Sequence, residues 1–176
     1  MGSASERPAV TAYVALGANL GDAAATLRDA LHRLDHTPGI RLLKASSLYR
    51  TAPIDSSGPD YLNAVAEVDT QLTAPTLLAA LQAIEHTHGR ERPYRNAPRT
   101  LDLDLLRYGS ATIDSPMLTV PHPRMIQRAF VLVPLAEIAP HAVSAQALDA
   151  VADQAIERVG PLQGASRSRT QSPPSC

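Results

Sequence analysis

The chain has 176 residues, 44% of them hydrophobic, and a formal net charge of −1 at pH 7. This length suits one domain with a sizeable core, and the near-neutral charge argues against a general nucleic-acid binder. No apolar run approaches the roughly 20 residues that span a bilayer, and residues 1–8 lack the apolar core of a signal peptide. Because Cys176 is the only cysteine, no disulfide can form within the chain, and a reducing cytoplasm is the expected location.

Strand and helix patterns alternate along the chain. Short apolar runs bounded by turn residues predict strands at residues 11–16, 40–50, 61–68 and 101–108. Apolar residues spaced three and four apart predict helices at residues 22–36, 74–88 and 146–158, with a short helix from 124 and an apolar segment over 129–139. Asp22 and Thr73 are expected to cap the first two helices. Gly17 and Gly21 are expected to form a tight turn, since no Lys-Ser/Thr follows to make a phosphate loop.

The order of these elements predicts an α+β fold. It reads β-α-β-β-α-β with helices appended, which is the ferredoxin-like split βαβ order. The β-β step over 40–69 is a hairpin, so the sheet should be mostly antiparallel and flanked by helices. We expect residues 1–10 to form a flexible leader and residues 11–160 a single domain. Residues 161–176, rich in Gly, Ser, Arg, Pro and Gln, are expected to be a disordered tail.

A leucine-rich run at residues 98–106 contains two aspartates, Asp102 and Asp104. Side chains two apart on a strand share a face, so both carboxylates point the same way, roughly 7 Å apart at about 3.3 Å per residue. Two like charges this close repel unless a cation lies between them. Mg²⁺ binds one or two carboxylates and completes its shell with water and phosphate oxygens. The alternative is the solvated face of an edge strand.

Two cationic segments flank this aspartate pair. Residues 89–99 carry four Arg against one Glu, and residues 121–128 carry one His and two Arg. This composition is typical of a site for a metal bound to a polyanion such as a nucleoside triphosphate. The alternative is a pair of solvated charged loops.

Tyr61 and Asn63 are expected on one face of the third predicted strand, with Leu62 and Ala64 on the other. An aromatic ring beside an amide can stack on a flat heterocycle and read its hydrogen-bonding edge. The alternative is a surface tyrosine and an asparagine at a strand end.

A series of motifs carries a resemblance to a known family. The motifs lie at residues 12–21, 47–53, 60–65, 89–90, 98–104 and 118–124. On these residues, the chain resembles the 6-hydroxymethyl-7,8-dihydropterin pyrophosphokinases of folate biosynthesis. The run P-R-T-L-D-L-D at 98–104, together with L-T-V-P-H-P at 118–123, is the most specific part of the match.

The resemblance implies an enzyme that transfers pyrophosphate from ATP to 6-hydroxymethyl-7,8-dihydropterin and releases AMP. It implies two Mg²⁺ ions held by Asp102 and Asp104, with ATP as co-substrate, which suits an in-line displacement at the β-phosphorus with no covalent intermediate. The expected form is a cytoplasmic monomer with no nucleic-acid or membrane partner.

The resemblance also implies roles for individual residues. Those expected to act in catalysis are Arg90, Arg99, Asp102 and Asp104. Those expected to contact ATP, or to lie near it, are Gln82, Glu85, Arg92, Arg99, Thr119, His122 and Arg128. Those expected at the pterin are Thr51, Pro53, Ile54, Tyr61, Asn63 and Phe130. Tyr61 and Phe130 would sandwich the ring; the alternative for Phe130, the only phenylalanine, is ordinary core packing.

The chain departs from the family pattern at two positions. Asn96 stands where many members carry a Trp, and Pro123 follows the histidine where some members have an aromatic residue. The basic segment 90–98 is expected to become ordered when nucleotide binds.

Three other functions stay open. A different Mg²⁺-dependent phosphoryl enzyme would use another acceptor, against which Tyr61, Asn63 and Phe130 argue. A non-catalytic binding module would not need two adjacent carboxylates, which are electrostatically costly without a metal. A nucleic-acid binder conflicts with the net charge and with the lack of alternating aromatic and basic residues.

Overall fold

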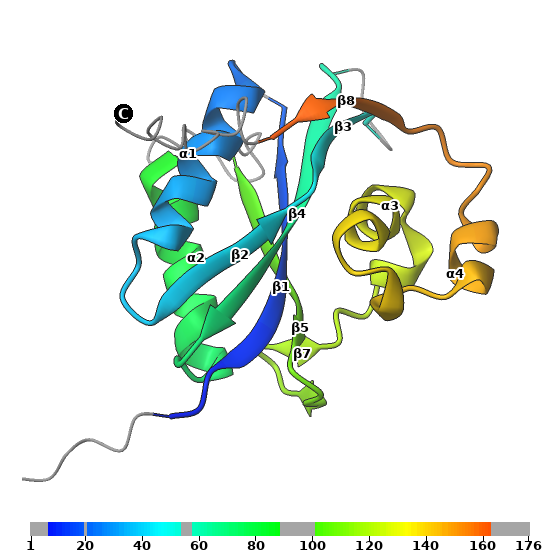
Figure 1. The fold of residues 1–176 in the computed structure, drawn as a ribbon. Coiled ribbons are helices and arrows are strands. Elements are labelled where there is room, and N and C mark those ends of the chain that lie inside the picture. Colours follow the sequence, from blue (N-terminus) through cyan, green and yellow to red (C-terminus); the bar gives the residue numbers. More distant parts are fainter. Residues whose placement is uncertain (1–6, 20, 54–57, 89–100, 163–176) are drawn as a thin grey trace, which may run out of the picture.

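The computed structural model describes residues 7–19, 21–53, 58–88 and 101–162. An antiparallel sheet lies between two layers of helices (Figure 1). The strands of this sheet are β1 (Val10–Ala18), β2 (Ile40–Ala45), β3 (Ser47–Thr51), β4 (Tyr61–Thr70), β5 (Asp102–Tyr108) and β8 (Glu157–Pro161). The helices are α1 (Ala23–Asp35), α2 (Ala74–His88), α3 (Ala129–Ile138) and α4 (Ala145–Ala150). A separate pair of short strands is β6 (Ile113–Asp114) and β7 (Thr119–Val120).

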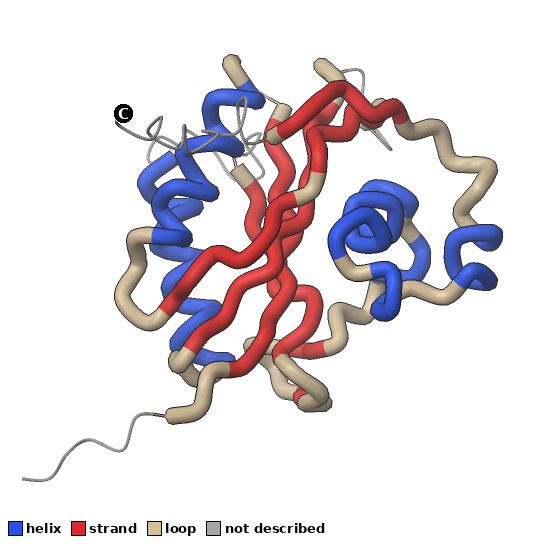
Figure 2. Tube along the Cα trace, in the orientation of Figure 1, coloured by secondary structure: helices blue, strands red, loops and turns tan. Residues whose placement is uncertain are grey.

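The sheet has the predicted ferredoxin-like arrangement. Its strand order is β5-β1-β4-β3-β8, and β2 pairs with β4 as well. Every ladder in it is antiparallel. Figure 2 shows the strands as one layer, with α1 and α2 on one side and α3 and α4 on the other. The α+β prediction is therefore confirmed.

Two apolar clusters hold the layers together. The cluster under α1 and α2 takes the residues predicted for the apolar stripes of these helices, among them Leu27, Leu34, Leu77 and Leu81. Both predicted caps form, since Asp22 accepts from the Ala25 N–H at 3.1 Å and the Thr73 hydroxyl accepts from the Thr76 N–H at 3.3 Å. The second cluster lies between the sheet and α3. None of the described helices is both long and apolar enough to cross a bilayer.

The predicted strand at 40–50 is two strands, because the chain breaks at Ser46. The Ser46 hydroxyl accepts the Val65 N–H at 2.9 Å, while the Ser46 N–H donates to the Val65 carbonyl at 2.9 Å. A side-chain oxygen thus replaces a backbone acceptor in the ladder. Hydrophobic alternation does not reveal such a replacement, so the sequence predicted one continuous strand.

The predicted helix at 146–158 is wrong beyond residue 150. The chain turns after α4, Val151 is buried beside α3, and residues 157–161 pair with β3 as strand β8. This pairing satisfies backbone groups along an edge of β3 that would otherwise be open. Leu162 is 1% exposed and belongs to the core under α1 and α2, so the fold includes the first two residues of the predicted tail. Residues 163–176 lie outside the described residues.

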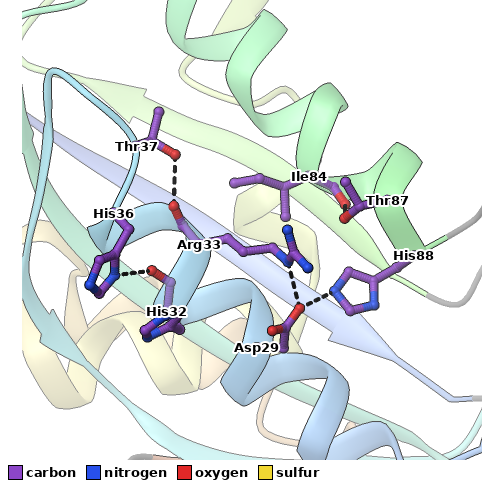
Figure 3. Close-up of polar contacts among 8 residues, drawn as sticks. All are labelled: Asp29, His32, Arg33, His36, Thr37, Ile84, Thr87 and His88. Carbon is purple, nitrogen blue, oxygen red and sulfur yellow. Dashed lines mark hydrogen bonds and ion pairs between the residues drawn. The ribbon is translucent and has the colours of Figure 1, made fainter.

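A polar cluster joins the outer surfaces of α1 and α2 (Figure 3). The Asp29 carboxylate pairs with Arg33 at 2.7 Å on its own helix and with the His88 Nε2 atom at 2.6 Å at the end of α2. His36 and Thr37 bond the last carbonyls of α1, those of His32 and Arg33. These contacts tie the two helices to each other and close the end of α1.

Candidate active site

A cavity of about 400 Å³ opens on the α3 side of the sheet. This volume is in the range of small-molecule sites. The residues that line it come from β1, β3, β4, β5 and the start of α3, with the segment just after β3; they are Ala15, Leu16, Gly17, Thr51, Ala52, Pro53, Tyr61, Asn63, Asp102, Asp104, Arg128 and Phe130. Eight of the residues predicted from the sequence are among them.

Asp102 and Asp104 reach this cavity from β5. Leu103 and Leu105 are buried in the opposite core, so strand alternation turns both carboxylates toward the cavity as predicted. The cross-strand neighbours of the two aspartates on β1 are Gly17 and Ala15. Small residues there leave space in front of the carboxylates. The alternative interpretation was the solvated face of an edge strand. β5 is indeed an edge strand, but its aspartate face lines a cavity.

The two carboxylates fit the needs of Mg²⁺. Among the described residues, no group of three or more His, Cys, Asp and Glu side chains could hold a metal ion by itself. Mg²⁺ does not need such a cage, since it commonly takes one or two carboxylates and draws its other ligands from water and substrate phosphates. A pair of aspartates in an open cavity is therefore a suitable donor set for a metal that arrives with a polyphosphate.

Glu85 supports the strand between the two aspartates. Its Oε2 atom accepts the Leu103 N–H at 2.9 Å. Because β5 is an edge strand, alternate N–H groups point away from β1, and an acceptor from α2 satisfies one of them. Glu85 thus contacts the backbone of the aspartate segment. Gln82 lies one turn earlier on α2 and is exposed.

The two predicted aromatic residues, Tyr61 and Phe130, line the same cavity from different elements. Tyr61 is the first residue of β4, and Phe130 lies in the first turn of α3. Both are half-buried, so Phe130 packs against the core while part of it faces the cavity. This placement favours the ring-binding hypothesis for Phe130 over ordinary core packing.

Asn63 is held rigidly beside these rings. It is 5% exposed, and its Nδ2 atom donates to the Thr51 hydroxyl at 2.8 Å. Its Oδ1 atom lies beside Gly17, where an added Cβ would come within 3.3 Å. Gly17 is part of β1, so the predicted tight turn begins later, at Gly21 with a φ of +60°. In the sequence, a glycine adjoining a predicted strand could have indicated that another group packs closely against the backbone there.

A second cavity of about 200 Å³ adjoins the first. Asp104, Arg128 and Phe130 line both, and His122 and Arg124 belong to the second alone. The Arg128 guanidinium lies over the Phe130 ring, 5.4 Å from its centroid, in cation–π range. The His122 Nδ1 atom accepts the Arg124 N–H at 3.2 Å, so a neutral ring carries its proton on Nε2.

The remaining predicted residues divide into two groups. Thr119 lies in β7 and lines neither of these two cavities. Ile54, Arg90, Arg92 and Arg99 lie outside the described residues, as does the expected ordering of segment 90–98.

A sequence profile of the 7,8-dihydro-6-hydroxymethylpterin-pyrophosphokinase (HPPK) family matches residues 13–140. The chain belongs to this family. The matched range contains the lining residues of both cavities. It also contains the motifs that carried the resemblance, from Tyr13 in the first strand to His122. The HPPK assignment made from those motifs is confirmed.

Relatives with the same family name cover most of this chain. A Methylorubrum extorquens protein named 2-amino-4-hydroxy-6-hydroxymethyldihydropteridine pyrophosphokinase is 47% identical over 133 residues, which are 75% of this chain and 84% of the relative. Bacterial relatives of the same name from Pseudomonas aeruginosa (47% over 129 residues, 73% and 80%) and Bacillus subtilis (42% over 149 residues, 84% and 89%) are similar.

The solved structures agree with the fold. The crystal structure of Plasmodium falciparum HPPK-DHPS A437G with SDX-DHP aligns with a TM-score of 0.63 at 16% identity. The alignment covers 78% of this chain and 43% of that one, so this HPPK chain spans less than half of the Plasmodium chain. At this identity the likeness shows the common fold alone.

Proposed function

We propose that this chain transfers pyrophosphate from ATP to 6-hydroxymethyl-7,8-dihydropterin and releases AMP. The single observation that carries the proposal is that one cavity joins an aromatic and amide wall to a pair of carboxylates. The wall suits a flat heterocycle, and the carboxylates suit a metal-bound triphosphate. The names of the bacterial relatives support the pterin as the acceptor of the pyrophosphate.

The pterin ring would stack between Tyr61 and Phe130. Both rings line the cavity, and their apolar surfaces favour stacking over solvation of the heterocycle. Because the Asn63 Nδ2 atom is already bonded to Thr51, the Asn63 carbonyl is the atom that would accept a hydrogen bond from the polar edge of the ring. We assign Pro53 and Ile54 to the same pocket.

Asp102 and Asp104 would hold two Mg²⁺ ions together with the triphosphate. Such ions, when bound, neutralise phosphate charge and lower the pKa of the attacking hydroxyl. The chain's contribution is to hold the two carboxylates on one face of β5, with Glu85 bonded to the backbone between them. That rigidity lets the site meet the triphosphate without rearranging first.

Cationic side chains would bind the phosphates from the other side. Arg128 and His122 lie at the second cavity, which shares Asp104 with the first. We propose that Arg90, Arg92 and Arg99 add to this charge, and that Gln82, Glu85 and Thr119 lie near the nucleotide. Positive charge around the transferring group stabilises the charge that develops in the transition state.

The reaction would be an in-line displacement. The bond that forms joins the hydroxymethyl oxygen of the pterin to the β-phosphorus of ATP. The bond that breaks joins this phosphorus to the oxygen that bridges it to the α-phosphate, and this oxygen leaves with AMP. The hydroxyl proton passes to water. We also propose that the predicted domain of residues 11–160, extended to Leu162 by the structure, acts as one catalytic domain, as a monomer in the cytoplasm.

The test is AMP release from ATP and Mg²⁺, with and without the pterin, for the wild type, Asp102→Ala and Asp114→Ala. Asp114 is an exposed carboxylate in β6 and lines neither cavity, so it serves as the matched control. We expect pterin-dependent AMP from the wild type and the control, and none from Asp102→Ala. Formation of ADP would instead indicate transfer of a single phosphoryl group. Nucleotide binding without turnover would favour a non-catalytic module.

A further inference from the structure

A partly buried hydrogen-bond cluster ties the end of α3 to β3. One oxygen of the Glu137 carboxylate accepts the Ser47 N–H at 2.9 Å and the Ser47 hydroxyl at 3.1 Å. The other oxygen accepts the Tyr49 hydroxyl at 2.5 Å. Arg158 on β8 donates to the Ser47 hydroxyl at 3.0 Å, which ties the edge strand into the same cluster. A carboxylate with three donors forms a strong and directional link.

The two linked elements are also the two walls of the ring slot. Phe130 precedes Glu137 by seven residues on α3, which is two helical turns, so both project from the same face of the helix. Tyr49 precedes Thr51 by two residues on β3, so these side chains share a face of the strand. In the ladder, Tyr49 lies opposite Asn63 and Thr51 lies opposite Tyr61. The link therefore joins the element that carries Phe130 to the strands that carry the other wall.

We propose that Glu137 and Tyr49 are positioning residues that fix α3 against β3 and so set the width of the slot between Phe130 and Tyr61. Neither residue lines the cavity, so each acts through the others. The identity of the ring rests on the proposed function, whereas the position of Phe130 does not.

Apolar packing under α3 does not supply this precision by itself. The cluster there consists mainly of Val65, Leu106, Val131, Leu135 and Ile138, and contacts of this kind are non-directional. Such contacts restrain the position of a helix less sharply than a directional hydrogen bond does. Ring stacking depends steeply on the separation of the rings. A directional link two turns from Phe130 supplies the sharper restraint.

Tyr49 keeps its proton at neutral pH. Burial, and then the hydrogen bond to Glu137, raise the pKa of Tyr49 to about 12. The hydroxyl therefore remains a hydrogen-bond donor to Glu137 at that pH.

The same face of the sheet offers a matched control. Tyr13 on β1 donates to Glu67 on β4 at 2.6 Å, and burial followed by this bond raises its pKa to about 12 as well. This pair is also a buried tyrosine bonded to a carboxylate, but it joins two strands and no helix, and it lines neither cavity. Only the Glu137 bond joins α3 to the sheet, so only its loss should affect the slot.

The first experiment follows Phe130 without any ligand. Since Phe130 is the only phenylalanine, labelling with 4-fluorophenylalanine yields one ¹⁹F resonance. We expect this resonance to shift or broaden in Glu137→Ala, to stay near the wild-type position in Glu67→Ala, and to be restored in part by Glu137→Gln, which keeps an acceptor. An unchanged resonance in Glu137→Ala, or equal changes in both alanine variants, would overturn the proposal.

The second experiment measures binding of 6-hydroxymethyl-7,8-dihydropterin to the wild type, Tyr49→Phe and Tyr13→Phe by titration calorimetry. We expect Tyr49→Phe to weaken binding by about tenfold and Tyr13→Phe to leave it within about twofold. Equal weakening in both variants means a general loss of rigidity and contradicts the positioning role. A wild type that binds no pterin contradicts the proposed function. In that case, the ¹⁹F experiment alone tests whether the link between Glu137 and Tyr49 positions Phe130.

Discussion

The two faces of the sheet are built from different side chains. Under α1 and α2, the strands and helices contribute a continuous apolar layer, and some charged groups outside it pair with one another. Asp29 is the clearest case, because Arg33 and His88 both bind its carboxylate (Figure 3). This face holds the chain together.

The face under α3 has a smaller apolar cluster and a cavity. Polar residues line this cavity: Asp102, Asp104 and Asn63 from strands, and Arg128 just before α3. Two carboxylates lie on one face of β5, where like charges repel each other unless a cation lies near them. The comparison indicates that residues for stability and residues for the proposed chemistry lie on opposite faces of the same strands, often at alternate positions.

The largest difference between an effect on activity and an effect on stability is expected at neighbouring positions of β5. The first of these is Asp104. Asp104→Asn should reduce kcat by about 10²–10³-fold, because one of the two carboxylates at the proposed metal and phosphate site is lost. Its unfolding midpoint in urea should stay at the wild-type value or rise slightly, since repulsion from Asp102 is relieved. A clear decrease in the urea midpoint of Asp104→Asn would contradict the division between the two faces.

Leu103→Ala should have the reverse effect. The side chain is buried in the α1 and α2 core, so its truncation should cost about 2–5 kcal/mol of unfolding free energy. The bond from its N–H to Glu85 uses the backbone and remains available. Below the melting transition, kcat should stay within a few-fold of the wild type, as measured by steady-state AMP release. A loss of activity in fully folded protein would show that the core face also controls the chemistry.

Gly17→Ala tests how tightly the cavity is built. The new Cβ would lie 3.3 Å from the Asn63 Oδ1 atom, so the amide must move by a few tenths of an ångström. We expect the KM for the pterin to rise several-fold, roughly 1 kcal/mol of binding, while the KM for ATP stays unchanged. Ala15→Gly at a neighbouring cavity position is the control, because it adds no atom. An equal rise in both KM values would mean that the substitution distorts β1 as a whole.

The smallest effect on stability is expected at Asp29, the surface carboxylate paired with Arg33 and His88. Arg33, and also His88, hold the pKa of Asp29 below its ordinary value of 3.8. The stabilisation is therefore present above pH 3.8 and is lost as the pH falls through the lower pKa of the folded state. Asp29→Asn should cost at most about 1 kcal/mol at pH 7, since the pair is partly exposed, and the difference from wild type should shrink below pH 4. Urea titrations at pH 7 and pH 3 measure this, and AMP release at pH 7 should not change.

Much of the site follows from local pattern. The alternation of leucine and aspartate on β5 correctly placed both carboxylates on one face, and the same rule placed Tyr61 and Asn63 together on β4. The stripes of α1 and α2 were also correct, because helical spacing is unambiguous over 13 and 15 residues. The motifs added Phe130, which lies 69 residues from Tyr61 in the sequence and which no periodicity could have connected with it.

Other features were predicted wrongly because distant partners decided them. Residues 151–158 have helical spacing, yet the open edge of β3 recruits the last of these residues into β8. The break at Ser46 depends on a hydroxyl that replaces a carbonyl opposite Val65. In each case a partner far along the chain supplied an interaction that outweighed the local preference.

The sequence by itself determined the β-α-β-β-α-β order up to β5 (with β2 and β3 predicted as one strand), the face of the strand on which Asp102, Asp104, Tyr61 and Asn63 lie, and the family. Those properties depend on neighbours within a few residues and on motif identity. Only the tertiary structure decided that Glu85 bonds the strand between the aspartates, that Gly17 makes room for Asn63, and that Glu137 holds α3 to Tyr49. These are single contacts between residues 18 to 88 positions apart, and their partners are chosen by packing in three dimensions, which leaves no periodic trace in the chain.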